Sequence, residues 1–229
     1  MCCRYTLRDP LIVAEHIRTL GANVDPAAIA PRFNAAPTQH LPAVISTIDG
    51  LLCLPMRWGM VPFYARKDPK RLQLINARSE IATEKPTFKQ SVQKRRCVLP
   101  SDGFFEWQRH PDGKTKTPLY IRRADERPFL FAGIYEEACE PFVAGFVLLT
   151  TGANEIIKPI HDRMPVILDL DEARAWLTPG PLSSDQVRAF CDSYPATQMH
   201  IDPVGTIVDN ARSDLPECVR PLSNLGSGR

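Results

Sequence analysis

RCVLPSDGFFEWQ, residues 96–108, is a run of apolar, aromatic and β-branched residues that predicts extended strand structure. Four later runs have the same character: PLYIRR (118–123), PFLFAGIYEE (128–137), FVLLTT (146–151) and MPVILDL (164–170). Turns separate most of these runs, and helical patterns fall irregularly among them. This order favours an α+β fold with a curved, largely antiparallel sheet or barrel over a doubly wound parallel sheet.

Helices and one hairpin can be placed around these strands. An aspartate N-cap followed by proline, and a closing glycine, predict a helix over residues 10–20, with residues 1–7 as a short extended lead-in. An Asp-Gly turn between two apolar runs predicts a hairpin over residues 41–58. Further helical patterns cover residues 79–94, interrupted by a proline, 170–177 and 183–194.

Length and composition are those of one soluble domain. The chain has 229 residues, of which 44% are hydrophobic and 24% charged. We expect a single domain over residues 1–222 and a disordered tail over residues 223–229, where only Leu225 is a strong apolar residue. No run approaches the ~18 apolar residues of a membrane span, and we expect no secretory signal at the N-terminus, where charged residues interrupt the apolar ones. The expected location is therefore cytoplasmic, without membrane insertion.

Charge and cysteine content limit how the protein could bind nucleic acid and whether it holds disulfides or zinc. The formal net charge of +2 is too small for a general polyanion binder, so a nucleic acid would have to be held by a local cluster of arginines. Scattered cysteines without a C-x-x-C pair indicate free thiols, and neither a disulfide framework nor a zinc site. There are seven of them: Cys2, Cys3, Cys53, Cys97, Cys139, Cys191 and Cys218.

Cys2 raises a question of chemistry. Methionine aminopeptidases trim Met1 when the next side chain is small, so Cys2 is expected to become the mature N-terminus. Its amine and thiol would then form a 1,2-aminothiol, in which the amine condenses with an aldehyde and the thiolate closes onto the imine carbon as a thiazolidine. Taken alone, however, a cysteine is more often an inert small hydrophobe.

Glu106 and His161 are candidates for proton transfer. Strand alternation puts Glu106 on the same face as Phe104 and opposite Phe105 and Trp107, so an interior position would raise its pKa. The alternative is a solvent-facing carboxylate. His161, in a turn before a strand, has a side chain suited to proton exchange near neutrality, although most loop histidines are surface residues.

Two other stretches could contact nucleic acid. In LINARSE, Asn76 and Arg78 share one face and could bind a phosphate and orient a sugar, or simply form a loop before the helix at residue 79. In RWGMVPFYARK, the aromatic residues Trp58, Phe63 and Tyr64 stand among cations, a mixture that suits unpaired bases. Trp58 is equally suited to the core.

Together these segments resemble the SRAP (SOS-response-associated peptidase) family of abasic-site processing proteins. The family pattern runs M-C-G-R, R-[YF]-N-x-A-P-T, W-G-x-x-P, N-A-R-x-E, C-x-x-P-x-x-G-[FWY]-[FY]-E-W and H-x-R-M-P. The corresponding segments keep that order: MCCR (1–4), RFNAAPTQ (32–39), WGMVP (58–62), NARSE (76–80), CVLPSDGFFEW (97–107) and HDRMP (161–165).

The resemblance implies an α+β domain around a strongly bent, barrel-like antiparallel sheet with peripheral helices. It also implies an enzyme, in lyase-type Schiff-base chemistry, that links itself through Cys2 to abasic sites in single-stranded DNA and shields the strand from breakage, typically at stalled replication forks. In this chemistry Glu106 would steer protons at the Cys2 amine, His161 would assist opening of the deoxyribose ring, and Asn76 would position Cys2 and the sugar. Phosphate contacts would come from arginines: Arg4, Arg78 and Arg163.

No metal or organic cofactor is implied, and we expect a monomer that associates with the nucleoid when bound to DNA. Two positions depart from the family pattern. Cys3 stands where the family has glycine, and Phe63-Tyr64 follows W-G-x-x-P where tryptophan is frequent. Two other functions stay open: a thiol peptidase using Cys2, His161 and Glu106, which includes self-removal of Met1, and a non-catalytic reader of single-stranded or modified DNA.

Overall fold

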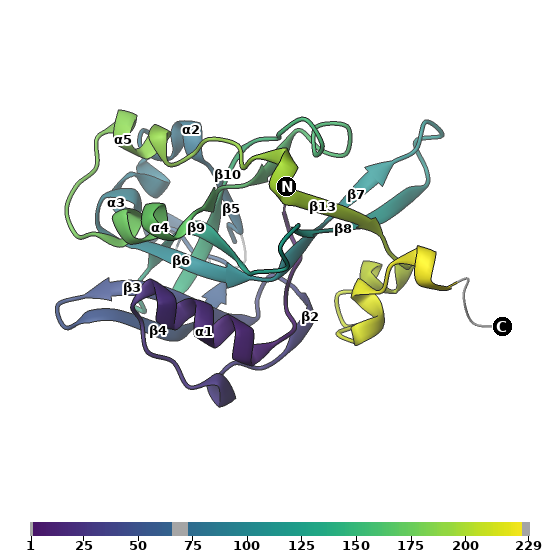
Figure 1. The fold of residues 1–229 in the computed structure, drawn as a ribbon. Coiled ribbons are helices and arrows are strands. Elements are labelled where there is room, and N and C mark those ends of the chain that lie inside the picture. Colours follow the sequence, from purple (N-terminus) through teal and green to yellow (C-terminus); the bar gives the residue numbers. More distant parts are fainter. Residues whose placement is uncertain (1, 66–72, 226–229) are drawn as a thin grey trace.

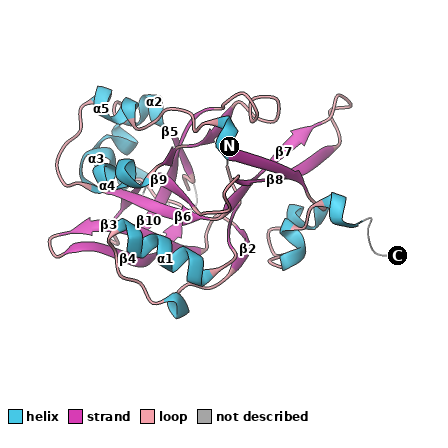
Figure 2. Ribbon diagram, in the orientation of Figure 1, coloured by secondary structure: helices cyan, strands magenta, loops and turns pink. Residues whose placement is uncertain are grey.

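Two β-sheets and a set of peripheral helices make up the fold (Figures 1 and 2). The computed structural model describes residues 2–65 and 73–225, without the side chains of Phe63, Asn224 and Leu225. The five-stranded sheet has the order β13-β8-β7-β1-β2. Its strands are β1 (Tyr5–Leu7), β2 (Arg32–Ala35), β7 (Gly103–Arg109), β8 (Lys116–Arg123) and β13 (Met199–Pro203).

The eight-stranded sheet is strongly curved. Its order is β11-β10-β4-β3-β6-β9-β12, with β5 paired to β10, and β9 also pairs with β10. Most pairs are antiparallel, and the parallel ones are β10 with β4 and β10 with β5. Its strands are β3 (His40–Thr47), β4 (Gly50–Trp58), β5 (Asn76–Arg78), β6 (Arg96–Ser101), β9 (Phe129–Glu136), β10 (Gly145–Gly152), β11 (Arg163–Pro165) and β12 (Ile167–Leu168).

The helices lie around the sheets, as Figure 2 shows in cyan. In Figure 1 helix α1 lies at the bottom and α2 to α5 gather at the upper left, with α4 joined to α1 by a hydrogen bond from Arg174 to the Thr19 carbonyl oxygen. The α-helices of the described residues are α1 (Pro10–Leu20), α2 (Ser79–Ala82), α3 (Pro86–Lys94), α4 (Leu170–Leu177) and α5 (Ser184–Ala189). No helix among these residues is long and apolar enough to cross a membrane.

The stretch 96–108 forms two strands rather than one, and they belong to different sheets. Strand β6 ends at Ser101 and β7 begins at Gly103, so the chain crosses between the sheets at Asp102. The Asp102 side chain, which is buried, accepts from the backbone N–H of Arg8 and from the Thr6 hydroxyl. Gly103 is required here, because a Cβ would collide with the Tyr120 side chain. This crossing was not evident from the apolar pattern, which is continuous.

The main core lies between the sheets. Tyr5 and Phe104, from the smaller sheet, pack against Phe131 of β9 with ring centroids 6.0 Å apart in each case. A second, smaller core covers the other face of the small sheet, where Phe105 and Tyr120 pack against residues 204–218 from the end of the chain. Each face of β7 is therefore covered.

The α+β prediction is confirmed, and most elements fall where the sequence placed them. The helix over residues 10–20 begins with Asp9 as N-cap and ends with Gly21 in the left-handed region at φ 114°. The last helical pattern is shorter than predicted, since α5 ends at Ala189. Residues 222–225 form a 3-10 helix, while residues 226–229 of the predicted tail lie outside the described residues.

Candidate active site

Cys2 lies in the interior, three residues before the first residue of β1, and is 0% exposed. Asn76 at the start of β5 donates from Nδ2 to the Cys2 carbonyl oxygen at 2.8 Å. Strand β5 is placed by its parallel pairing with β10, in which Asn76 faces Leu148. Two residues far apart in the sequence, both predicted as site residues, are thus in direct contact.

Asn76 also carries an unused acceptor. Its Oδ1 is buried and has no hydrogen-bond partner among the described residues. A buried amide oxygen without a donor costs about 1–3 kcal/mol in folding free energy. Such a group is expected where a ligand or a further donor completes the hydrogen bonding.

Glu106 lies on β7 with its side chain in the interior and is 4% exposed. Phe104, on the same face, belongs to the main core, whereas Phe105 belongs to the second core. The predicted alternation is therefore confirmed. Burial raises the pKa of Glu106, and nearby positive charge, including that of His161, works against the rise.

The Cys2 thiol is electrostatically linked to this carboxylate. Burial raises the pKa of Cys2 well above its ordinary value, and the charges of Glu106 and Cys3 raise it further. Its Sγ donates to the Arg4 carbonyl oxygen at 3.6 Å. The thiol is consequently protonated at neutral pH, and a reaction at sulfur needs a group that takes this proton.

His161 lies in the turn before β11, as predicted. Its Nδ1 is 3.0 Å from the backbone nitrogen of Arg163, which donates, and 3.0 Å from a carboxylate oxygen of Asp162, which can only accept. Nδ1 must be unprotonated to accept from Arg163, but it must carry a proton to donate to Asp162. In the neutral ring Nδ1 accepts from the Arg163 backbone nitrogen and the proton sits on Nε2.

Arg163 holds the His161 turn against β10 and α2. Its two terminal nitrogens donate to the Glu80 carboxylate at 2.6 and 2.8 Å, and one of them also donates to the Thr150 carbonyl oxygen. The Arg163 side chain is only 11% exposed. The Arg163 guanidinium is thus engaged by a carboxylate of the protein, and the predicted phosphate contact at Arg163 stays a prediction.

Trp58 lies in the core, which is one of the two positions that the sequence left open. It is 0% exposed and packs between Tyr5 and Phe146, with ring centroids 5.0 and 6.2 Å away, and its Nε1 donates to the Ile75 carbonyl oxygen at 3.0 Å. A ring enclosed on both sides cannot stack on a base. The position near a strand end left both possibilities open, and the large apolar area of tryptophan is used in the core.

The remaining predicted DNA contacts lie nearer the surface. Arg4 is half-buried and donates from Nη1 to Asn34 Oδ1 at 3.0 Å and to the Val208 carbonyl oxygen at 2.9 Å. Arg78 and Tyr64 are exposed, and the Tyr64 hydroxyl is 3.0 Å from that of Thr87. The Phe63 side chain lies outside the described residues. None of these contacts tests a role in DNA binding, which stays a prediction.

Sequence reasoning missed Glu80 and Asn34. Both lie inside motifs that had been noticed, but no pattern names their partners, which are distant in the chain. Asn34 is 0% exposed and donates to three carbonyl oxygens, those of Val208, Asn210 and Ser213. It therefore ties the N-terminal strands to the end of the chain.

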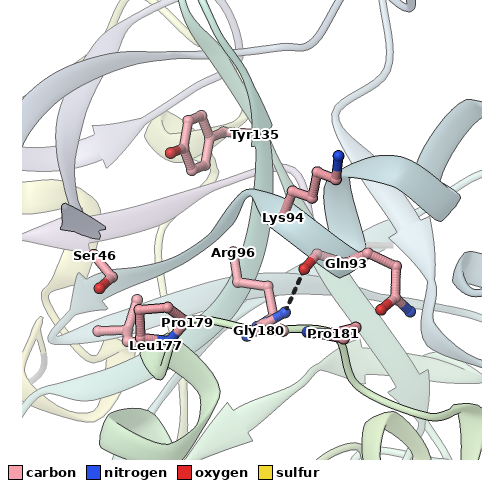
Figure 3. A pocket seen from close by; sticks show the side chains of 9 residues that line it. All are labelled: Ser46, Gln93, Lys94, Arg96, Tyr135, Leu177, Pro179, Gly180 and Pro181. Carbon is pink, nitrogen blue, oxygen red and sulfur yellow. Dashed lines mark hydrogen bonds between the residues drawn. The ribbon is translucent and has the colours of Figure 1, made fainter. Parts of the chain in front are cut away.

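A cavity of about 410 Å³ lies elsewhere, beside Arg96, and contains none of the predicted site residues (Figure 3). The Arg96 guanidinium is saturated by five backbone carbonyl oxygens, among them that of Gln93, drawn in Figure 3. It has no donor left for a ligand. Across residues 2–65 and 73–225, no group of three or more His, Cys, Asp or Glu side chains is arranged to hold a metal ion.

The model of the family described as SOS response associated peptidase (SRAP) matches residues 1–211. The chain belongs to this family. Abasic site processing protein YoqW of Bacillus subtilis is 34% identical over 222 residues, covering 96% of this chain and 99% of that protein. Abasic site processing protein HMCES of Rattus norvegicus is 30% identical over 242 residues, covering 88% of this chain and 68% of that protein.

A crystal structure of a protein from Bacteroides thetaiotaomicron has the same fold. It superimposes with a TM-score of 0.79 at 25% identity, covering 96% of this chain and 99% of that one. The predicted family resemblance is thus confirmed at the level of sequence and fold.

The Glu80–Arg163 pair gives a pH-dependent stability difference. Its hydrogen bond with Arg163 lowers the pKa of Glu80 below the ordinary 4.5, so the pair stabilises the fold above that pH and loses its effect as pH falls through the lowered pKa. Glu80→Gln should reduce the free energy of unfolding at pH 7 by about 1 kcal/mol, because the Glu80 side chain is half exposed.

Urea unfolding at a series of pH values measures this difference. It should shrink toward zero in strongly acidic solution. Glu84→Gln, a change at an exposed residue in the turn between α2 and α3, removes the same charge without breaking the pair and should match wild type throughout. A pH-independent loss in Glu80→Gln would contradict the ionic contribution.

Proposed function

We propose that this protein captures abasic sites in single-stranded DNA by forming a thiazolidine at Cys2 once Met1 has been removed. The observation that carries the proposal is the hydrogen bond from the Asn76 side chain to the Cys2 carbonyl oxygen in the interior of the protein. At the same place the charge of Glu106 raises the pKa of the Cys2 thiol, and the charge of His161 works against the raised pKa of Glu106. Membership of the SRAP family, and relatives named as abasic site processing proteins, support it.

The chemistry balances without a cofactor. The Cys2 amine adds to the aldehyde carbon of the ring-opened sugar, and loss of one water gives the imine. The sulfur then bonds to the imine carbon while the thiol proton ends on the former imine nitrogen. The product is a five-membered ring, which removes the aldehyde that would otherwise promote strand breakage by β-elimination.

Glu106 and His161 divide the proton transfers. Because the Cys2 thiol is protonated in its buried place, Glu106 is the natural carrier of a proton from sulfur to nitrogen. A raised pKa suits this role, because it makes the Glu106 carboxylate a better proton acceptor. His161, with its proton on Nε2, would donate to the ring oxygen as the deoxyribose opens.

Asn76 would position both reactants. Its Nδ2 already holds the Cys2 carbonyl, and its buried Oδ1 is free to accept from the new amine or from a sugar hydroxyl. Arg78 and Arg4 are the proposed phosphate contacts, and Tyr64 offers an exposed ring for stacking on a base.

The peptidase reading is less well supported. A thiol protease needs a thiolate of lowered pKa, whereas burial raises the pKa of Cys2. The non-catalytic reader would need only the exposed arginine and tyrosine side chains, and it leaves the buried Cys2, Glu106 and Asn76 without a role.

One experiment separates the three functions. Purified protein is mixed with single-stranded DNA bearing an abasic site, and adducts that survive denaturation are counted for wild type, Cys2→Ala and Cys3→Gly. We expect a stable adduct with wild type and Cys3→Gly. Cys2→Ala keeps an amine but lacks sulfur, so any adduct should appear only after borohydride reduction of the imine.

Other outcomes point elsewhere. Equal DNA binding by wild type and Cys2→Ala without any adduct favours the reader, and Cys2-dependent peptide cleavage without adducts favours the peptidase. Intact mass of the active protein provides an independent check, because retained Met1 on adduct-forming protein contradicts the mechanism.

A further inference from the structure

The hairpin between β7 and β8 is a basic projection from the strand that carries Glu106. Residues 109–116 (RHPDGKTK) are all exposed, and the hairpin extends away from the body of the domain at the upper right of Figure 1. We call these residues the basic arm. It carries three cationic side chains, Arg109, Lys114 and Lys116, against one carboxylate, in a chain whose formal net charge is only +2.

The one carboxylate of the basic arm is used to fix its turn. Asp112 accepts from the backbone nitrogens of Lys114 and Thr115, both at 2.9 Å, and from the Thr115 hydroxyl at 2.6 Å. These hydrogen bonds hold the turn in one geometry. The turn of the basic arm is therefore a defined backbone structure, held by its own hydrogen bonds.

Two of the cations face each other at a cost in stability. Arg109 and Lys116 are directly opposed in the β7–β8 register, and like charges in that position destabilise a hairpin. Arg109 and Lys114 make no ion pair among the described residues, and Lys116 lies 3.7 Å from Asp209. A polyanion bound along the arm would offset this repulsion.

The basic arm continues the surface beside the candidate site. The Lys116 Nζ lies 5.0 Å from the centroid of the Trp107 ring, and the Arg4 guanidinium lies 5.9 Å from the same centroid. Trp107 directly follows Glu106, and at about 3.4 Å per strand residue Arg109 lies roughly 10 Å beyond Glu106. Alternate strand residues point to opposite faces, so Trp107 and Arg109 lie on the face of β7 opposite Glu106. There Arg4, Trp107 and Lys116 form a cationic and aromatic surface that continues into the basic arm.

We propose that the basic arm binds the phosphate backbone on one flank of the DNA strand whose abasic site is held at Cys2. This inference rests on the proposed function and extends it, because it assigns a second contact region to residues that take no part in the chemistry. Lysine and arginine spaced along a groove bind single strands through their phosphates, without sequence preference.

The test compares two triple variants of the full chain. Arg109→Gln/Lys114→Gln/Lys116→Gln neutralises the arm, and Lys85→Gln/Lys89→Gln/Lys94→Gln removes the same charge from the exposed lysines at α3, on the opposite side of the domain in Figure 1. Binding is measured by anisotropy on single strands that carry a tetrahydrofuran analogue, which has no aldehyde. The analogue is placed centrally, or at either end so that one flank is missing.

The arm variant should show a plot of log affinity against log salt that is less steep by about 2, since each lost single-strand phosphate contact accounts for about 0.7. Its loss of affinity should vanish on the strand that lacks one particular flank. The α3 variant should retain the wild-type slope. An unchanged slope in the arm variant, or equal losses on both flanks, would overturn the proposal.

A parallel reaction of wild type with a true abasic site keeps this result distinct from the proposed function. If wild type forms the stable adduct while the arm variant keeps the wild-type salt dependence of binding, only the proposed phosphate binding by the basic arm is refuted. If wild type forms no adduct, the capture mechanism fails irrespective of the slopes.

Discussion

Glu106→Gln is expected to form adducts with abasic DNA at least about a hundredfold more slowly than wild type, the usual range for loss of a positioned acid or base being about 10² to 10⁴. The amide fills the same buried space but cannot take the proton that leaves the Cys2 thiol. Single-turnover rates of adduct formation, measured at saturating protein, isolate this step from DNA binding. DNA affinity should be preserved.

The same substitution should stabilise the fold at neutral pH. The folded-state pKa of Glu106 is raised above the ordinary 4.5 by burial, so the folded protein holds this proton more tightly than the unfolded chain. Wild-type stability therefore falls as pH rises from about 4.5 through the raised pKa, and the Glu106→Gln variant lacks this loss. A stabilised but inactive variant is the signature of a carboxylate kept in the interior for function.

Thermal unfolding at several pH values measures the second effect. The variant should melt above wild type at pH 7 and match it below about pH 4.5, where the carboxyl is protonated in both states. Glu137→Gln, an exposed change of the same charge, should alter neither rate nor melting. A wild-type rate, or a lower melting temperature at neutral pH, would refute the role of Glu106.

Arg96→Met should lose about 3–5 kcal/mol of unfolding free energy, the largest stability effect that we expect from a single substitution here. Arg96 is 7% exposed and donates to the carbonyl oxygens of Val92 and Gln93 at the end of α3 and of Trp176, Thr178 and Gly180 at and after the end of α4. Its guanidinium also lies 5.6 Å from the Trp176 ring centroid.

The loss is expected to be large because the Arg96 guanidinium caps the C-terminal ends of two helices, α3 and α4. The last carbonyls of a helix have no partner within the helix, and a positive charge there also offsets the helix dipole. Methionine fills the volume but leaves these carbonyls buried without donors. Arg96→Lys should lose less unfolding free energy than Arg96→Met, because the ammonium keeps the positive charge. It should still be less stable than wild type, because three donors cannot satisfy five acceptors.

Urea unfolding gives the measurement. Lys94→Met, an exposed change two residues earlier, should remain within about 0.5 kcal/mol of wild type. If Arg96→Met also stays within about 1 kcal/mol, the carbonyls find water through the adjacent cavity, and the capping role of Arg96 is wrong.

The fold class and most element positions could be predicted because they depend on local signals. The Asp9 cap, the Gly21 stop and the Asp49-Gly50 turn each act within a few residues, and each is present as predicted. The change of sheet at Asp102 could not be predicted, because it depends on partners such as Arg8 and Tyr120 that lie elsewhere in the chain.

In the candidate site, too, local features could be predicted from the sequence and contacts between distant segments could not. Alternation along β7 correctly placed Glu106 beside Phe104, since the period of a strand is a local property. It could not decide between surface and core for Trp58, nor reveal that Arg163 is paired with Glu80, because both outcomes depend on packing between distant segments.

The pairing of β1 with β7 has a consequence for the newly made chain. Tyr5 faces Phe104 across these strands, and Asn76 and His161 join the site from still other parts of the sequence. During synthesis Cys2 emerges among the first residues, but its surroundings cannot be assembled until His161 has left the ribosome. Cys2 therefore stays without the Asn76, Glu106 and His161 side chains around it until at least 161 of the 229 residues have been translated.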